Sequence, residues 1–306
     1  MSIIKTFNNK KLNNGETLTI SVYLIGIFLI AETIGGILSN SLAILADAGH
    51  MFSDFLAILL SLVAYKYESK PADNKRSFGY SRMQIIASFI NGTTLVVISV
   101  VITITAIIRM FDPPVVEANI MLMISILGMI INGITLGVLQ MSKEKNLNMQ
   151  GAILHVIGDL LGFISAIIGA LIIKYLGWYI VDPIISVLIG CLILNSAIRL
   201  IKRSMHILME GAPDDLKELD IKNSLMAIEG VVDVQHVHIW LLNDHYAITT
   251  MNLVLQGDCD PFDATLIAQQ ILKQNKKIQH ATIAIEKYNP EYHLKTDYDH
   301  HHANKD

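Results

Sequence analysis

The sequence predicts a bundle of six membrane-spanning helices followed by a small α+β domain. Of the 306 residues, 52% are hydrophobic and 16% are charged, which is too apolar for an ordinary soluble domain. Six apolar stretches each reach the ~20 residues that a helix needs to cross the hydrocarbon core. After about residue 205, short alternating segments replace the long apolar runs.

Each apolar stretch is expected to be a helix, because lipid offers no hydrogen bonds to an open backbone. A polar cytoplasmic tail precedes the first stretch at residues 1–16. The transmembrane domain is expected over residues 17–203. Its six spans cover residues 17–38, 42–66, 83–108, 118–141, 149–173 and 178–201.

The basic residues predict the orientation of the spans. Thirteen Lys and Arg residues flank the spans on one side, whereas Arg109 and Lys174 alone lie on the other. Basic residues concentrate on the cytoplasmic side of membrane proteins. Both termini are therefore expected in the cytoplasm.

Residues 206–290 predict a cytoplasmic domain of the order helix, strand, strand, helix, strand, which matches most of a ferredoxin-like α+β unit. A first helix is expected between Pro213 and Gly230, and a second from Pro261 to about Lys277. The strands are expected at 231–242, 246–256 and 280–287. Residues 291–306 read as a flexible tail that holds His293 and His300 to His302.

A short phrase occurs twice inside the apolar stretches: His50 with Asp54 in the second, and His155 with Asp159 in the fifth. Residues four apart lie on one face of a helix. A charge at mid-bilayer costs roughly 2.5–3.5 kcal/mol on insertion scales, so such groups usually have a function. The second and fifth spans run antiparallel, which lets all four side chains meet at one depth.

Two imidazoles and two carboxylates suit a tetrahedral Zn²⁺ ion, and Cd²⁺ and Co²⁺ also fit. The same groups bind protons, with ordinary pKa values of ~6.5 for histidine and ~4 for carboxylates. Protons therefore compete with the metal, which is a physical basis for exchanging one for the other. Asp47, one turn from His50, is either an accessory residue of this site or a helix cap.

The alternative for the repeated phrase is hydrogen bonding between helices. That explanation suffices for the other polar residues of the spans, at ~0.6–2 kcal/mol each. Gly158 and Gly162 have the spacing of small residues that allows a close helix contact. The other polar residues are Glu32, Asn91, Asn132, Asp182 and Asn195.

Other functions find less support in the sequence. There is no basic tract for nucleic acid, no thiolate cluster from the two cysteines, and no motif for an organic cofactor. A membrane-embedded metallohydrolase would need an open metal position and a general base. A zinc sensor that does not transport remains an alternative, because the soluble domain permits it.

The chain resembles the zinc-exporting side of the cation diffusion facilitator family over residues 17–288. The segment from Ser41 to Asp54 is similar to the family's second-helix signature, and His155 to Asp159 is similar to its fifth-helix half. Further similar segments are 77–80, 182–184, 211–213, 238–240 and 282–286.

This resemblance implies a homodimer in a membrane that exports Zn²⁺ by proton antiport through alternating access. The short loops and the absence of a long His-rich insert suggest a bacterial inner membrane. The ions are its substrates, and no enzyme activity is implied. The histidine and aspartate set resembles the zinc and cadmium members, since manganese members tend to replace the histidines.

The cytoplasmic metal site of the family is only partly present. Its first two histidines fall on Gln235 and Met251, whereas His280 and Glu286 match. His236 is an additional candidate, although period-two alternation turns it to the opposite strand face from Gln235. The loop from Ser69 to Arg82 keeps Asp73 but has no histidine, so no metal site is expected there.

The resemblance also suggests a charge pair between Arg82, before the third span, and Glu210, just after the sixth. Such a pair would join the membrane and cytoplasmic domains. The alternative is two solvated charges, worth ~0–1 kcal/mol.

Overall fold

The computed structural model describes residues 14–68, 73–140, 147–244, 246–274 and 277–289, so most of both predicted tails lies outside it. The side chain of His155 also lies outside the described part, although its backbone belongs to a helix. The chain divides into two compact units, 1–202 and 203–306, which are described separately below.

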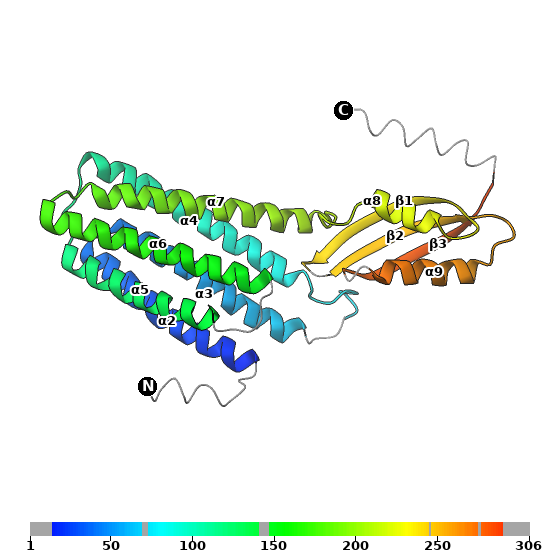
Figure 1. The fold of residues 1–306 in the computed structure, drawn as a ribbon, viewed down its shortest axis with the longest axis horizontal. Coiled ribbons are helices and arrows are strands. Elements are labelled where there is room, and N and C mark those ends of the chain that lie inside the picture. The colour runs from blue at the N-terminus through cyan, green and yellow to red at the C-terminus, as the bar shows by residue number, and fades with distance from the viewer. Residues whose placement is uncertain (1–13, 69–72, 141–146, 245, 275–276, 290–306) are drawn as a thin grey trace. The chain divides into compact units, whose positions relative to one another are not determined.

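The first unit consists of long helices that alternate in direction and lie side by side (Figure 1). Within the described residues, four of them are long and apolar enough to cross a membrane: 83–111, 118–137, 156–176 and 181–208. The bounds are α2 Asn14–Ser39, α3 Leu42–Glu68, α4 Met83–Phe111, α5 Ala118–Gln140, α6 Leu147–Leu176 and α7 Val181–Leu208.

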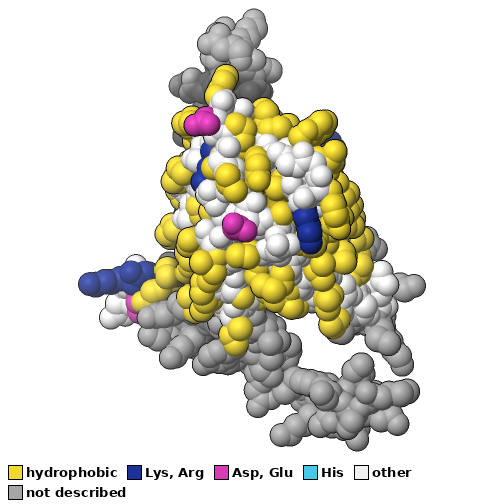
Figure 2. All heavy atoms as spheres, turned by 90° about the vertical axis from the view of Figure 1, so that its left-hand side faces the viewer, with side chains coloured by type: hydrophobic (Ala, Val, Ile, Leu, Met, Phe, Trp, Pro, Cys, Tyr) yellow, Lys and Arg dark blue, Asp and Glu magenta, His cyan; other side chains and the backbone are white. Residues whose placement is uncertain are grey.

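The outer surface of these helices is apolar, as expected for contact with lipid. Phe111, Leu192 and Leu154 are 88%, 69% and 69% exposed, respectively, whereas a soluble protein would bury most of them. Figure 2 views the end at which α4 ends and α5 begins, and hydrophobic side chains cover most of the described surface in this view. The chain is therefore an integral membrane protein.

The interior of this unit is packed around the first turns of α3. Ala43 and Ile44 of α3 are buried against Met121 of α5 and Ala170 of α6. Glycines allow further close approach, because a Cβ on Gly35 of α2 would collide with the Ile124 side chain. The first turns of α3 are thus held on several sides by apolar contacts.

The second unit has the predicted order of helices and strands. It contains α8 Glu218–Met226, β1 Val231–Asn243, β2 Tyr246–Leu255, α9 Pro261–Gln274 and β3 Ile278–Lys287. β2 lies in the middle of the sheet, antiparallel to β1 and parallel to β3. The two helices cover one face, where Leu225, Met251, Leu253 and Leu272 form the core.

The first helix of this unit begins later than predicted. The chain forms a turn after Pro213, in which the Leu216 N–H donates to the Pro213 carbonyl, and the helix begins at Glu218. Lys217 at the N-cap has an extended backbone. The acidic residues Glu218 and Asp220 still lie in the first turn, where the helix dipole favours negative charge.

A bulge in β1 corrects the expected orientation of His236. Gln235 pairs with Asn252 and His238 pairs with Thr250, so β1 contains one residue more than β2 over this step. His236 has φ +52° and is exposed, whereas Val237 is buried in the core. The helix-covered face is therefore filled by Val237, and simple alternation fails at this point.

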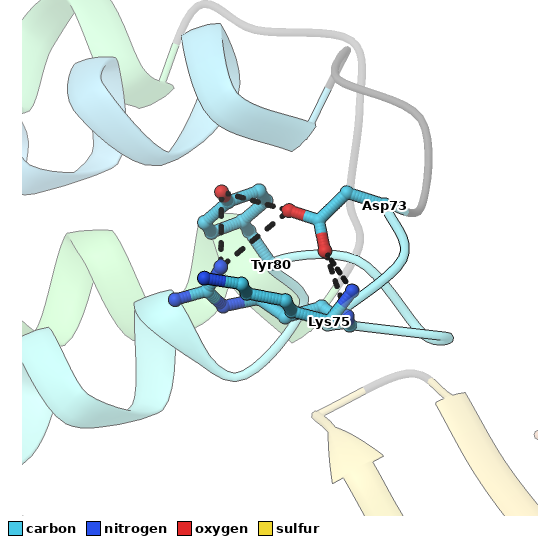
Figure 3. A network of polar contacts seen from close by, with 4 residues as sticks. Asp73, Lys75 and Tyr80 are labelled. Carbon is cyan, nitrogen blue, oxygen red and sulfur yellow. Dashed lines mark hydrogen bonds and ion pairs between the residues drawn. The ribbon is translucent and has the colours of Figure 1, made fainter.

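The loop before α4 is ordered by Asp73 (Figure 3). Its carboxylate accepts the backbone N–H groups of Lys75 and Arg76 at 2.8 and 2.7 Å, and the Tyr80 hydroxyl at 3.3 Å. The Arg76 guanidinium lies 3.5 Å from Asp73 Oδ2 and 4.7 Å from the Tyr80 ring centre. These bonds, led by that from Lys75, lower the pKa of Asp73.

We predict that Leu253→Ala destabilises the second unit by about 2–5 kcal/mol, because Leu253 is fully buried in the core. Pulse proteolysis of the full chain across a urea series measures the effect. Leu219→Ala is the control, since Leu219 is 64% exposed and its truncation should cost less than about 0.5 kcal/mol. Equal urea midpoints for the two variants would contradict the packing described here.

We predict that Asp73→Asn opens the loop before α4. A lowered pKa means that the stabilisation is present above pH 3.8, the ordinary value, and is lost only as the pH falls through the lower native value. At pH 8, trypsin should therefore cut after Lys75 and Arg76 several times faster in Asp73→Asn than in the wild type. Mass spectrometry identifies the cuts, and Asn74→Ala is the neighbouring control. Unchanged cleavage in Asp73→Asn would refute the role of the network.

Candidate metal site

The first half of α3 presents three of the predicted site residues. Asp47, His50 and Asp54 are all half-buried, and their spacing places them on one side of the helix. Small residues surround them in the sequence: Ala46 and Ala48 are buried, and a Cβ on Gly49 would collide with Ile98 of α4. Close packing against α4 thus directs this polar side of α3 toward its other neighbours.

Helix α6 brings Asp159 to this side of α3. His50 Nε2 lies 3.7 Å from Asp159 Oδ1. Two ligands that each lie ~2.0–2.2 Å from a tetrahedral ion are roughly 3.3–3.6 Å apart. The observed distance is close to what one shared ion requires.

The contact between α3 and α6 has a defined register. A Cβ on Gly162 would lie 4.0 Å from Asp47 Oδ1, so Gly162 faces Asp47 one turn from the pair of His50 and Asp159. From Asp47 to His50 the chain advances three residues along α3, whereas their partners on α6, Gly162 and Asp159, go back by three. The two helices are therefore antiparallel (Figure 1). Four further residues along the same register would pair Asp54 with His155.

Two of the four predicted ligands are thus brought together in the described part of the chain. Without the His155 side chain, the described residues contain no group of three or more His, Cys, Asp or Glu that would hold a metal. The complete set of His50, Asp54, His155 and Asp159 stays a prediction.

Glu32 of α2 is a further acidic residue at this site, and the sequence interpretation assigned it only to helix packing. It is fully buried, and neither carboxylate oxygen has a hydrogen-bond donor among the described residues. Its carboxyl group lies near enough to Asp47 and Asp159 to interact with both electrostatically. The sequence feature that could have indicated this role is an acidic residue inside the apolar run from Phe28 to Ile34.

Unpaired polar atoms gather at this level of the unit. Within the described part, Glu32 Oε1 and Oε2 and Asp47 Oδ2 are buried and have no hydrogen-bond partner. Buried polar atoms without partners are costly unless something else binds them. The excess of carboxylates makes a cation the chemically suitable partner.

Asn91 of α4 links α4 to α3 beside this region. Its Nδ2 donates to Ser53 Oγ at 2.8 Å, next to Asp54, and both side chains are buried. This confirms the interhelical role expected for Asn91. Asn132 differs, because its Nδ2 donates to the Gly128 carbonyl of its own helix at 3.3 Å.

The cytoplasmic candidates lie on the sheet face opposite the helices. His280 and Glu286 are exposed on β3, six residues apart, which corresponds to ~20 Å along a strand. The Glu286 carboxylate accepts Asn252 Nδ2 at 2.5 Å, and Asn252 pairs with Gln235. Met251 is buried in the core on the other face.

A cytoplasmic metal site with His280 and Glu286 stays a prediction. One ion could bind both side chains only if they came from different copies of the chain, because the two residues lie ~20 Å apart on the same strand. The prediction for His236 also stays open, with its side chain exposed at the bulge.

The predicted charge pair involves residues at the ends of two helices. Arg82 is the N-cap of α4, and Glu210 follows α7 with φ +62°. The two residues belong to the separately described units, so their pairing stays a prediction.

The comparisons with known proteins cover nearly the whole chain. Residues 18–209 match the cation efflux transmembrane domain, and residues 213–288 match the cytoplasmic domain of cation efflux proteins.

Three bacterial relatives illustrate the similarity. The zinc transporter ZitB of Escherichia coli is 39% identical over 301 residues, covering 95% of each chain. The cadmium, cobalt and zinc/H⁺–K⁺ antiporter of Bacillus subtilis is 36% identical over 283 residues, covering 91% of each. The metal cation efflux system protein CzcD of Cupriavidus metallidurans is 37% identical over 274 residues, covering 89% of this chain and 87% of CzcD.

Two family domains in the expected order and relatives above 30% identity over most of their length leave one conclusion. The chain belongs to the cation efflux family, whose members are also called cation diffusion facilitators.

Proposed function

We propose that this protein exports Zn²⁺ from the cytoplasm, with Cd²⁺ and Co²⁺ as further substrates, in exchange for protons. The observation that carries the proposal is the 3.7 Å approach of His50 and Asp159 between α3 and α6. A nitrogen and an oxygen ligand from two different helices converge there inside an apolar bundle. The protein is a transporter and not an enzyme.

The metal preference follows from the ligand types. Imidazole nitrogen with carboxylate oxygen suits borderline ions such as Zn²⁺, whereas Mg²⁺ and Ca²⁺ prefer more oxygen ligands. The relatives named for zinc, cadmium and cobalt agree with this choice. Zn²⁺ is the transported substrate in this proposal, and no organic cofactor is needed.

Proton exchange follows from the same ligands. A metal requires neutral imidazole and ionised carboxylate, so entry of the metal releases protons and entry of protons releases the metal. Glu32 and Asp47 add acidic groups next to this site. The Bacillus relative is named an antiporter of protons and potassium, which supports coupling to a counter-cation.

The topology of the proposal has six spans with both termini in the cytoplasm. Helices α2 and α3 would be the first two spans, since their polar residues belong to the site. Bacterial relatives support the bacterial inner membrane as the location. The proposed domain bounds are 1–16, 17–203, 206–290 and 291–306, and the division of the chain after residue 202 supports them. The protein is proposed to be a homodimer, and the match to the cytoplasmic domain of cation efflux proteins supports this.

We predict that Asp159→Ala and Asp54→Ala each reduce zinc transport to background. Each change removes one of four ligands and leaves the others unable to complete the site. Zinc uptake into inside-out vesicles with an imposed pH gradient measures the effect. Asp112→Ala is the matched control, because Asp112 is an exposed carboxylate just after α4 and should leave transport unchanged. Normal zinc flux in Asp159→Ala would reject the site.

We predict that His50→Asp weakens the discrimination between zinc and manganese. Replacing imidazole by carboxylate gives the site three oxygen ligands and one nitrogen, which favours harder ions. The ratio of Zn²⁺ to Mn²⁺ flux in proteoliposomes should fall about tenfold or more relative to the wild type. The same flux ratio in both proteins would show that His50 does not select the metal. Zinc binding without flux in the wild type would instead indicate a sensor.

A further inference from the structure

The N-terminus of α3 is capped by a carboxylate from α7. Asp182 Oδ2 accepts the Leu42 N–H at 2.9 Å, and Oδ1 accepts the Ala43 N–H at 3.3 Å. Oδ1 also accepts the Ser41 hydroxyl at 2.5 Å. The first N–H groups of a helix have no partners within the helix, so this carboxylate satisfies two of them from 140 residues away.

Ser41 completes the cap. Its hydroxyl oxygen accepts a hydrogen bond from the Ile44 N–H at 3.3 Å, and its hydroxyl group donates a hydrogen bond to Asp182 Oδ1. Ser41, Asp182 and Ser186 are all fully buried, so water cannot replace these bonds. The negative charge of Asp182 lies in the first turn of α7 and at the start of α3, where two helix dipoles favour it.

The turn before α3 is held from other elements as well. Asn40 has φ +54°, its carbonyl accepts Arg109 Nη1 at 2.8 Å, and its Nδ2 donates to the Val115 carbonyl at 3.3 Å. The Glu117 N–H donates to the Ser39 carbonyl at 2.9 Å. The α2–α3 turn is thus tied to α4, to the segment before α5 and, through Asp182, to α7.

We propose that Asp182 is a positioning residue of the transport site, which sets the height of α3 by capping it from α7. His50 lies eight residues after Leu42, or about 12 Å along the helix axis. A shift of the α3 start therefore moves His50 and Asp54 relative to Asp159 on α6. Asp182 itself does not bind the metal, because its two oxygens already accept three donors at the α3 end.

This inference rests on the proposed transport site, and its first test is independent of transport. In hydrogen–deuterium exchange of the purified full-length protein, the peptide that contains Leu42 to Ile44 should exchange about tenfold faster in Asp182→Asn than in the wild type. The reason is that the Asn side chain has an NH₂ group in place of one carboxylate oxygen. This group donates hydrogen bonds and cannot accept one from an N–H of α3. Unchanged exchange in this peptide overturns the cap.

The second test measures the effect on the site. Co²⁺ and Zn²⁺ titrations of the same preparations should show about tenfold weaker binding in Asp182→Asn, with the visible Co²⁺ bands unchanged in shape because the ligands are the same. Altered Co²⁺ bands would make Asp182 a ligand and overturn the inference, as would unchanged affinity. If the wild type binds neither ion, the proposed transport site fails instead.

Two further variants separate positioning from packing. Ser186→Ala is the matched control, because Ser186 Oγ donates at 2.7 Å to the Asp182 carbonyl and does not contact α3 through this bond. It should leave metal affinity unchanged, and an effect as large as that of Asp182→Asn would overturn the inference. Ser41→Ala should weaken binding in the same direction and add little to Asp182→Asn, since both act through one cap. It also serves as the test if Asp182→Asn does not fold.

Discussion

The rest of this structure depends on keeping acidic groups inside an apolar bundle. Carboxylates at membrane depth are costly unless a cation, a proton or a donor accompanies them. Here Glu32 lies close to Asp47 and Asp159, and His50 Nε2 is 3.7 Å from Asp159 Oδ1. The surrounding helices present apolar surface outward and pack tightly inward, so the polar layer is shielded from lipid. In the proposed function, a divalent cation is the partner that stabilises this arrangement.

The geometry of the helices determines which groups face one another. Antiparallel packing of α3 on α6 brings His50 to Asp159 and places Gly162 opposite Asp47. If the proposed site carries the ion, this packing must loosen during transport, because the ion has to enter from one side and leave on the other. The α3 cap by Asp182 would then be a fixed point at the end of a helix.

The cytoplasmic unit is built by a different principle. Its helices cover one sheet face with a conventional apolar core, and the other face carries both polar residues such as Asn252 and Glu286 and buried apolar residues such as Val254. On that face Gln235 pairs with Asn252 across β1 and β2, and Asn252 Nδ2 donates to the Glu286 carboxylate of β3, which forms a polar row. A second copy of the chain facing this surface would bring its own polar row to it, which agrees with the dimeric state implied by the family.

The sequence by itself determined the six long helices, the order of the α+β unit and the repeated His-x-x-x-Asp phrase, because these depend on local periodicity and on the cost of charge in lipid. It also led to the family, since the phrase around Asp47 and His50 is specific. Only the tertiary structure decided the role of Asp182, the place of Glu32 and the bulge at His236. Those outcomes depend on which residues far apart in the sequence meet, and on one extra residue in a strand, neither of which is encoded in local pattern.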